Sequence, residues 1–81
     1  MKVRLLYFAV LRDITGKSEE VVELPEGTRA EEVWKRLRMK HDQLAAYERP
    51  PMTAINESYA SADQPLRDGD EVAFIPPVAG G

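Results

Sequence analysis

The sequence predicts an α+β domain in which a five-stranded mixed sheet packs against one main helix. Three observations lead to this fold class. The 81 residues leave room for a single domain with one small core. Strand-like apolar segments stand near both ends of the chain, and one stretch with helical periodicity lies between them. A content of 43% apolar and 31% charged residues is typical of a globular chain.

Two strands are expected in the first third of the chain. Lys2–Ala9 is apolar on both of its alternations, which is typical of a central strand covered on both faces. Val10–Thr15 is expected to form a single helical turn that ends at Gly16. Glu19–Leu24 is the second expected strand, and the chain reverses between the two strands at Gly16-Lys17.

The main helix has the clearest signal. Thr28 is a favourable N-cap, and Glu31 three residues later completes the pattern of a capping box. Apolar residues then recur on one helix face, at Ala30, Val33, Trp34 and Leu37. We expect Trp34 in the core rather than on a recognition surface. The basic residues of this helix are expected to be solvated, because two of them follow a glutamate by four residues, in the pairs Glu31–Lys35 and Glu32–Arg36.

The second half of the chain predicts one more short helix and three strands. The expected elements are a helix at His41–Glu48, a strand at Met52–Asn56, a short strand near Tyr59 and a last strand at Glu71–Ile75. Proline ends the short helix at Arg49-Pro50-Pro51, and Gly69 supplies the positive φ of a tight turn. Pairing the first and last strands centrally and in parallel buries the most apolar surface. The expected architecture is therefore a β-grasp, or ubiquitin-like, fold.

The residues that the sequence lacks exclude several classes of function. Without cysteine there is no disulfide, no cysteine-bound metal and no thiol nucleophile. The single histidine, His41, cannot form a histidine-rich metal site, so we expect no metal. The net charge of −3 argues against nucleic acid and anionic membranes as partners. No apolar stretch is long enough for a membrane span and no signal peptide opens the chain, so we expect a cytoplasmic protein without autonomous catalysis.

The chemistry is expected at the C-terminus, which reads Pro76-Pro77-Val78-Ala79-Gly80-Gly81. At average usage, glycine occupies both of the last two positions with a chance of roughly 1 in 200. Pro76-Pro77 favours an extended course, so we expect a domain over residues 1–77 and a flexible tail over 78–81. Because glycine lacks Cβ, Gly80-Gly81 fits a narrow channel and exposes the terminal carboxylate. That carboxylate is ionised at neutral pH and needs activation, for which ATP-dependent adenylation by another enzyme is the obvious route.

Three motifs carry a resemblance to a known family. They are Leu5–Ala9 followed by Leu11-Arg12-Asp13 and Gly16, the triplet Ala54-Ile55-Asn56, and the long run from Pro65 to Gly81. Together they resemble the small, sulfur-carrying subunit of molybdopterin synthase, also called molybdopterin converting factor subunit 1. The segment Met39–Pro51 carries no motif of that family, and Ala79 stands where a small hydroxylated residue is also common.

The resemblance implies a definite chemistry for Gly81. An E1-like enzyme would adenylate its carboxylate with ATP, and a sulfurtransferase would convert the adenylate to a thiocarboxylate. The tail, with Gly80 next to the reacting group, would then enter the large catalytic subunit and give sulfur to cyclic pyranopterin monophosphate, which forms the dithiolene of molybdopterin. The family complex is a heterotetramer, in which this chain would be a non-catalytic subunit with no bound cofactor.

Strand alternation also predicts a docking surface. If Leu5, Tyr7, Val72 and Phe74 face the helix, then the opposite face of the sheet carries Leu6, Phe8, Ala73 and Ile75. An exposed apolar face on a small domain is usually a partner site. We expect Phe8, Tyr59 and Ile75 to form this site together with the tail residues Pro76, Pro77, Val78 and Ala79. The alternative is that Phe8 lies in a second small core under a loop.

Three other functions fit parts of the pattern. A sulfur carrier of another pathway, for thiamine or a tungsten cofactor, would share the Gly-Gly end and its chemistry. A ubiquitin-like modifier would join Gly81 to lysines of target proteins. A plain interaction module would be unaffected by the loss of Gly80 and Gly81. The Pro-Pro-Val-x-Gly-Gly ending favours the molybdopterin assignment over these alternatives.

Overall fold

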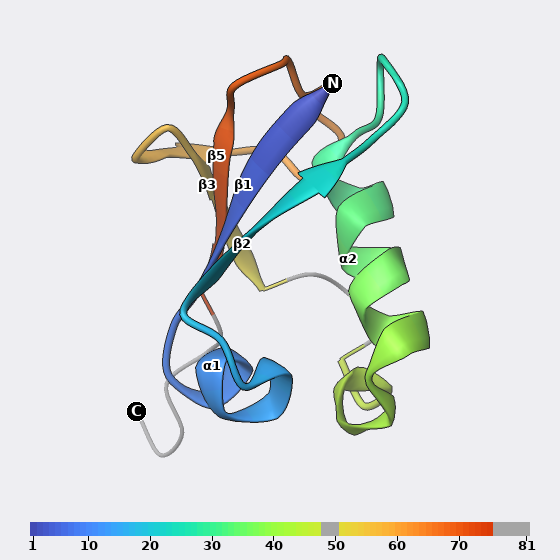
Figure 1. Cartoon of the computed structure of the whole chain (residues 1–81), viewed down its shortest axis with the longest axis vertical. Coiled ribbons are helices and arrows are strands. Elements are labelled where there is room, and N and C mark those ends of the chain that lie inside the picture. Colours follow the sequence, from blue (N-terminus) through green and yellow to red (C-terminus); the bar gives the residue numbers. More distant parts are fainter. Residues whose placement is uncertain (48–50, 76–81) are drawn as a thin grey trace.

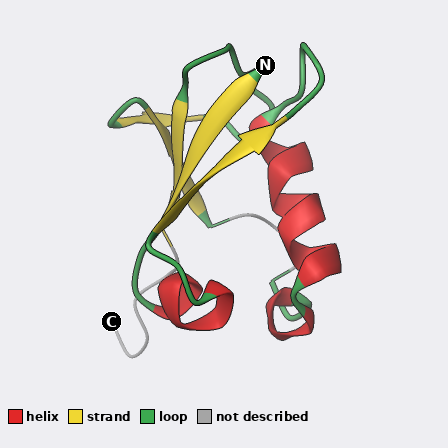
Figure 2. Cartoon of the chain, in the orientation of Figure 1, coloured by secondary structure: helices red, strands yellow, loops and turns green. Residues whose placement is uncertain are grey.

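The computed structural model describes residues 1–47 and 51–75 of the chain. Figures 1 and 2 show a twisted sheet with the longer helix lying along one side of it. In chain order the elements are β1 (Lys2–Tyr7), α1 (Val10–Thr15), β2 (Glu19–Glu23), α2 (Ala30–Lys40), the short 3₁₀ helix η1 (Asp42–Leu44), β3 (Met52–Ile55), β4 (Ser58–Ala60) and β5 (Glu71–Ile75). No helix in these two described ranges is long and apolar enough to cross a membrane.

The sheet has five strands in the order β2-β1-β5-β3-β4. The strands β1 and β5 lie next to each other and are parallel, with Leu5 opposite Val72 and Tyr7 opposite Phe74. All the other neighbouring strands are antiparallel. The predicted α+β class, the mixed sheet and the central parallel pair are therefore confirmed.

The core lies between the sheet and α2. Trp34 of α2 is only 1% exposed, and its ring centroid is 5.2 Å from that of Phe74 on β5. The Trp34 Nε1–H donates a hydrogen bond of 3.3 Å to the Tyr47 carbonyl oxygen, which ties the segment after η1 to the helix. Trp34 is thus a core residue, as its spacing predicts. The same core cluster contains Val3, Leu5, Tyr7, Leu11, Leu24, Ala30, Val33, Leu37, Leu44, Ile55, Leu66, Val72 and Phe74.

The start of α2 differs from the prediction by one residue. The Thr28 hydroxyl donates to the Pro25 carbonyl oxygen at 2.7 Å, so it does not cap the helix. Arg29 is the N-cap residue, and its backbone N–H donates to the Glu32 carboxylate at 3.3 Å. In the described ranges neither Glu31 nor Glu32 pairs with the basic residue one turn later, so those expected ion pairs were wrong.

The helix expected at His41–Glu48 is reduced to η1. His41 has an extended backbone with φ of −126°, which ends α2 and prevents a continuous helix. Leu44 is fully buried, so packing against the core, rather than helix propensity, holds this segment. The expected proline stop includes Arg49 and Pro50, which lie outside the described residues.

Within residues 1–47 and 51–75, a second layer covers only one face of β1, although both of its alternations contain apolar residues. Val3, Leu5 and Tyr7 are buried against α2, whereas Lys2 and Arg4 on the opposite face are exposed. The expectation of a strand covered on both faces was therefore wrong. A chain with one long helix in its described part has no second layer to place on the other face.

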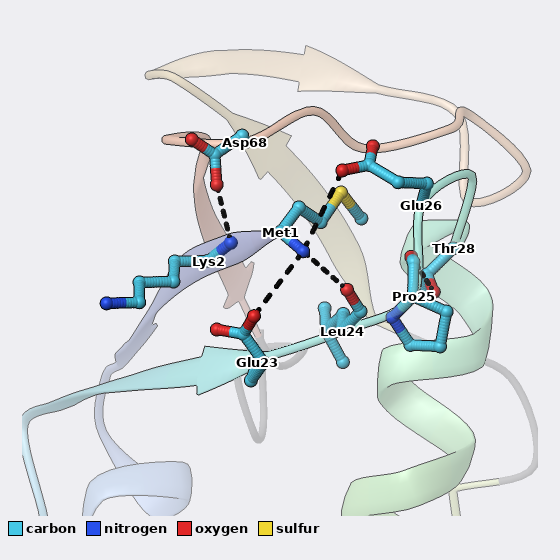
Figure 3. A network of polar contacts seen from close by, with 8 residues as sticks. All are labelled: Met1, Lys2, Glu23, Leu24, Pro25, Glu26, Thr28 and Asp68. Atoms are coloured by element: carbon cyan, nitrogen blue, oxygen red, sulfur yellow. Dashed lines mark hydrogen bonds and ion pairs between the residues drawn. The ribbon is translucent and has the colours of Figure 1, made fainter.

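Hydrogen bonds hold the beginning of β1 between two distant segments (Figure 3). The Met1 amino group donates to the Leu24 carbonyl oxygen at 2.8 Å and lies within 4 Å of two glutamates, at 3.7 Å from Glu23 and 3.8 Å from Glu26. The Lys2 N–H donates to the Asp68 carboxylate at 2.7 Å, in the turn that precedes β5. Gly69 of this turn has φ of +86°, as predicted. The Met1 contacts thus join the start of β1 to the end of β2, and the Lys2–Asp68 hydrogen bond joins it to the turn before β5.

Candidate functional site

The open face of the sheet contains a shallow, largely apolar groove of about 330 Å³. Residues from four strands, from the end of β1 and from the β3–β4 turn line it: Leu6, Phe8, Ala54, Glu57, Tyr59, Glu71, Ala73 and Ile75. The structure thus brings together Phe8, Tyr59 and Ile75, the three docking residues predicted from the sequence within the described ranges.

Strand register explains the shape of this groove. Leu6 of β1 lies opposite Ala73 of β5, Ala73 lies opposite Ala54 of β3, and Ala54 lies opposite Tyr59 of β4. With neighbouring strands about 4.8 Å apart, this row spans roughly 14 Å across the sheet. The two alanines in the middle make a low floor between bulkier side chains. A groove of this shape accepts an apolar side chain or segment from a partner.

The aromatic side chains that border the groove are available for contact. Phe8 is 48% exposed and Tyr59 is 71% exposed. The alternative of a buried second core under a loop therefore does not describe Phe8. Phe8 directly precedes Ala9, which has a positive φ of 49° where the chain turns into α1. Phe8 is therefore the first residue beyond the end of β1.

Two carboxylates stand on the rim of the groove. Glu71, at the start of β5, forms an ion pair with Arg4 of β1. Glu57 lies in the turn between β3 and β4, and it makes no side-chain hydrogen bond or ion pair with residues 1–47 or 51–75. The side chain of the neighbouring Asn56 makes two hydrogen bonds. Its Nδ2–H donates to the Asp70 carboxylate at 2.9 Å, and its Oδ1 accepts from the Glu71 N–H at 3.0 Å.

The one described side chain with a clearly shifted pKa is Tyr7, which lies on the face of the sheet that packs against the core. Burial raises the pKa of the Tyr7 hydroxyl above its usual value, and the negative charge of the Glu20 carboxylate acts in the same direction. The Tyr7 hydroxyl is buried and makes no hydrogen bond of ordinary length and angle within the described part of the chain. A neutral phenol packed in the core offers no acid or base for catalysis. Nor do the described residues contain a cluster of acidic, histidine or cysteine side chains able to hold a metal ion.

Known proteins resemble this chain over its full length. The profile of the ThiS family matches residues 5–81. The chain is also 35% identical to the molybdopterin synthase sulfur carrier subunit of Chlamydomonas reinhardtii, over 83 aligned positions that cover 100% of both proteins. The chain belongs to the ThiS family.

Solved structures related to this ThiS-family chain share its fold. A putative molybdopterin converting factor, subunit 1, from Pyrococcus furiosus superposes with a TM-score of 0.83 at 35% identity, covering 96% of this chain and 99% of that one. A protein–protein complex of subunits 1 and 2 of molybdopterin-converting factor from Helicobacter pylori includes a chain with a TM-score of 0.64 at 21% identity, covering 100% of both chains. At that identity the second likeness concerns the fold alone.

Two features of this ThiS-family site were missed from the sequence. Met52 is exposed and lies opposite Ile75, so it extends the apolar face beyond the groove. The sequence could have indicated this position, because Met52 and Ala54 are two residues apart on one strand and therefore share a face. Glu57 had no such signal, because its place on the rim depends on the β3–β4 register.

The predicted carrier residues fall outside the part of the chain that the structure describes. These are Gly81, Gly80 and the four tail residues Pro76, Pro77, Val78 and Ala79. The structure does describe the residue that precedes them: Ile75 ends β5 and lines the groove on the open face. The segment that leads to the predicted carrier residues therefore follows directly after a residue of the candidate docking surface.

Proposed function

We propose that this protein is the sulfur carrier subunit of a molybdopterin synthase and that Gly81 bears the sulfur as a thiocarboxylate. The observation that carries the proposal is the 35% identity over the whole length to a relative of that name. The family profile also extends to Gly81, so the C-terminal Gly-Gly is part of the match.

The chemistry requires help from other proteins. The Gly81 carboxylate attacks the α-phosphate of ATP on an E1-like enzyme, which releases pyrophosphate and leaves an acyl-adenylate. The terminal sulfur of a persulfide on a sulfurtransferase then displaces AMP and forms an acyl disulfide. A second thiol attacks the sulfurtransferase sulfur of that S–S bond, which releases the thiocarboxylate and forms a disulfide. Adenylation is needed because the free carboxylate is an anion that resists nucleophilic attack. This chain contributes the terminus and no catalytic side chain.

The apolar sheet face is proposed to dock the large subunit of the synthase. Docking there positions the segment after Ile75 to carry Gly81 into the active site of that subunit, where sulfur passes to cyclic pyranopterin monophosphate. The dithiolene contains two sulfur atoms and each carrier delivers one, so two deliveries complete one product. Two carriers on a dimer of large subunits form the proposed heterotetramer.

Reconstitution of the reaction tests this function. The protein with a Gly81 thiocarboxylate, made as a synthetic or intein-derived thioacid, is mixed with the large subunit and cyclic pyranopterin monophosphate. We expect dithiolene product to appear, and we expect none from the same protein with an ordinary carboxylate. A variant lacking Gly80 and Gly81 is the matched control, because it keeps residues 1–75 and the docking surface. Absence of product from the thiocarboxylate form, with the complex formed, would contradict the proposal.

A further inference from the structure

The turn between β3 and β4 holds a glutamate in a conformation that glutamate disfavours. Asn56 and Glu57 are the two residues of this turn, with φ of +51° and +70°. Two-residue hairpin turns with positive φ at both positions favour asparagine followed by glycine. Asn56 fits this preference. Glu57 does not, because a side chain with a Cβ is strained in the left-handed region.

No contact within the described part of the fold accounts for the glutamate. Its side chain is exposed and makes no hydrogen bond or ion pair with residues 1–47 or 51–75. The turn itself is secured by Asn56, which bonds to Asp70 and to the Glu71 N–H. Residues held in unfavourable backbone conformations concentrate at functional sites. We therefore look for a functional reason for the glutamate at position 57 in the groove that it lines.

Glu57 leaves a negative charge on the rim of the apolar groove. Two acidic residues line that groove, and the charge of Glu71 is compensated by Arg4. Glu57 has no such compensation within the described residues. Tyr59 follows Glu57 by two residues and lines the same groove. A partner that fills the groove therefore removes water from around Glu57, and a carboxylate that loses its water needs a cation or donors in exchange.

We propose that Glu57 is a specificity-determining residue that pairs with a lysine or arginine of the large synthase subunit. This proposal rests on the proposed function, and it adds the chemistry of the partner: an apolar segment for the groove with a cationic side chain at the β3–β4 end. A partner without that cation leaves a desolvated carboxylate unpaired, so Glu57 selects against it.

The role of the Glu57 charge is tested by measuring how tightly Glu57 variants bind the large subunit from the same organism. We expect Glu57→Gln to weaken binding about 3–10-fold at low salt (about 50 mM) and less at about 500 mM, because salt screens the lost attraction. Glu57→Lys reverses the charge and is expected to weaken binding more than Glu57→Gln. Glu31→Gln is the matched control, since Glu31 lies on α2 at the other side of the sheet. The control is expected to bind as the wild type does.

The variant Glu57→Gly separates binding from folding. Glycine relieves the strained backbone, so the melting temperature is expected to rise by about 2–5 °C while the affinity falls as it does for Glu57→Gln. A residue with a purely structural role would give the opposite result, a lower melting temperature and unchanged affinity.

Two outcomes overturn the inference in distinguishable ways. If Phe8→Asp weakens the complex but Glu57→Gln and Glu57→Lys bind like the wild type at low salt, the role of Glu57 is refuted and the proposed function stands. If the wild-type protein itself does not bind the large subunit, both the role of Glu57 and the proposed function fail.

Discussion

Replacing Phe8 with aspartate is expected to break the proposed docking contact. A phenylalanine side chain offers about 200 Å² for burial, and Phe8 is 48% exposed, which leaves roughly 95 Å² for a partner to cover. At about 25 cal/mol per Å², this area contributes up to about 2.4 kcal/mol, or roughly a 60-fold change in Kd. The aspartate adds the cost of removing a carboxylate from water, so the measured loss is expected to reach or exceed that value.

Isothermal titration calorimetry with the large subunit, combined with urea unfolding, measures this effect. Met39→Asp is the matched control, because Met39 is 85% exposed and lies on α2, away from the open sheet face. We expect Phe8→Asp to lower the free energy of unfolding by about 1 kcal/mol, a typical value for a half-buried site. Binding by Phe8→Asp within about 3-fold of the wild type, from a folded variant, would refute the docking surface.

Three further predictions concern the core and the turn that supports the rim. Tyr7→Phe removes a buried hydroxyl without a partner in the described chain, so unfolding by urea at pH 7 is expected to show a gain of about 1 kcal/mol. Because the Tyr7 pKa is raised in the folded state, the unfolded state loses its proton first, and stability falls as pH rises above 10.0; Tyr7→Phe is expected to reduce that fall. Trp34→Ala is expected to cost about 3–5 kcal/mol, measured by the same unfolding, and a loss below about 1 kcal/mol would contradict its place in the core. Asn56→Ala removes two hydrogen bonds of the turn and is expected to lower the free energy of unfolding by about 2 kcal/mol; an unchanged unfolding midpoint would show that these bonds do not secure it.

Much of the fold could be predicted because its elements have strong local patterns. The apolar composition of β1 and β5 identifies them as strands, and the helical spacing of Ala30, Val33, Trp34 and Leu37 identifies the core face of α2. The helix start was misplaced because Thr28 has a competing acceptor, the Pro25 carbonyl oxygen, which no sequence pattern reveals. The segment after His41 was misjudged because its conformation depends on burying Leu44 against α2.

The candidate site was partly predictable for a related reason. Alternation places Phe8 and Ile75 on the face opposite Tyr7 and Phe74, and the packing of α2 against Tyr7 and Phe74 leaves that face open. Met52 and Glu57 join the site through the pairing of β3 with β5 and β4, and strand register is not encoded locally. The role of Gly81 stays a prediction, because residues 76–81 lie outside the described structure.

The state of the Gly81 carboxyl group in cells is the most direct test of the central claim. Trypsin releases the peptide from Asp68 to Gly81, which contains neither methionine nor cysteine, so oxidation of sulfur cannot imitate the exchange of oxygen for sulfur. We expect mass spectrometry of the protein from cells that make the cofactor to show this exchange at the C-terminal carboxyl. Finding only the carboxylate, or finding Gly81 joined to lysines of other proteins, would contradict the assignment as a sulfur carrier.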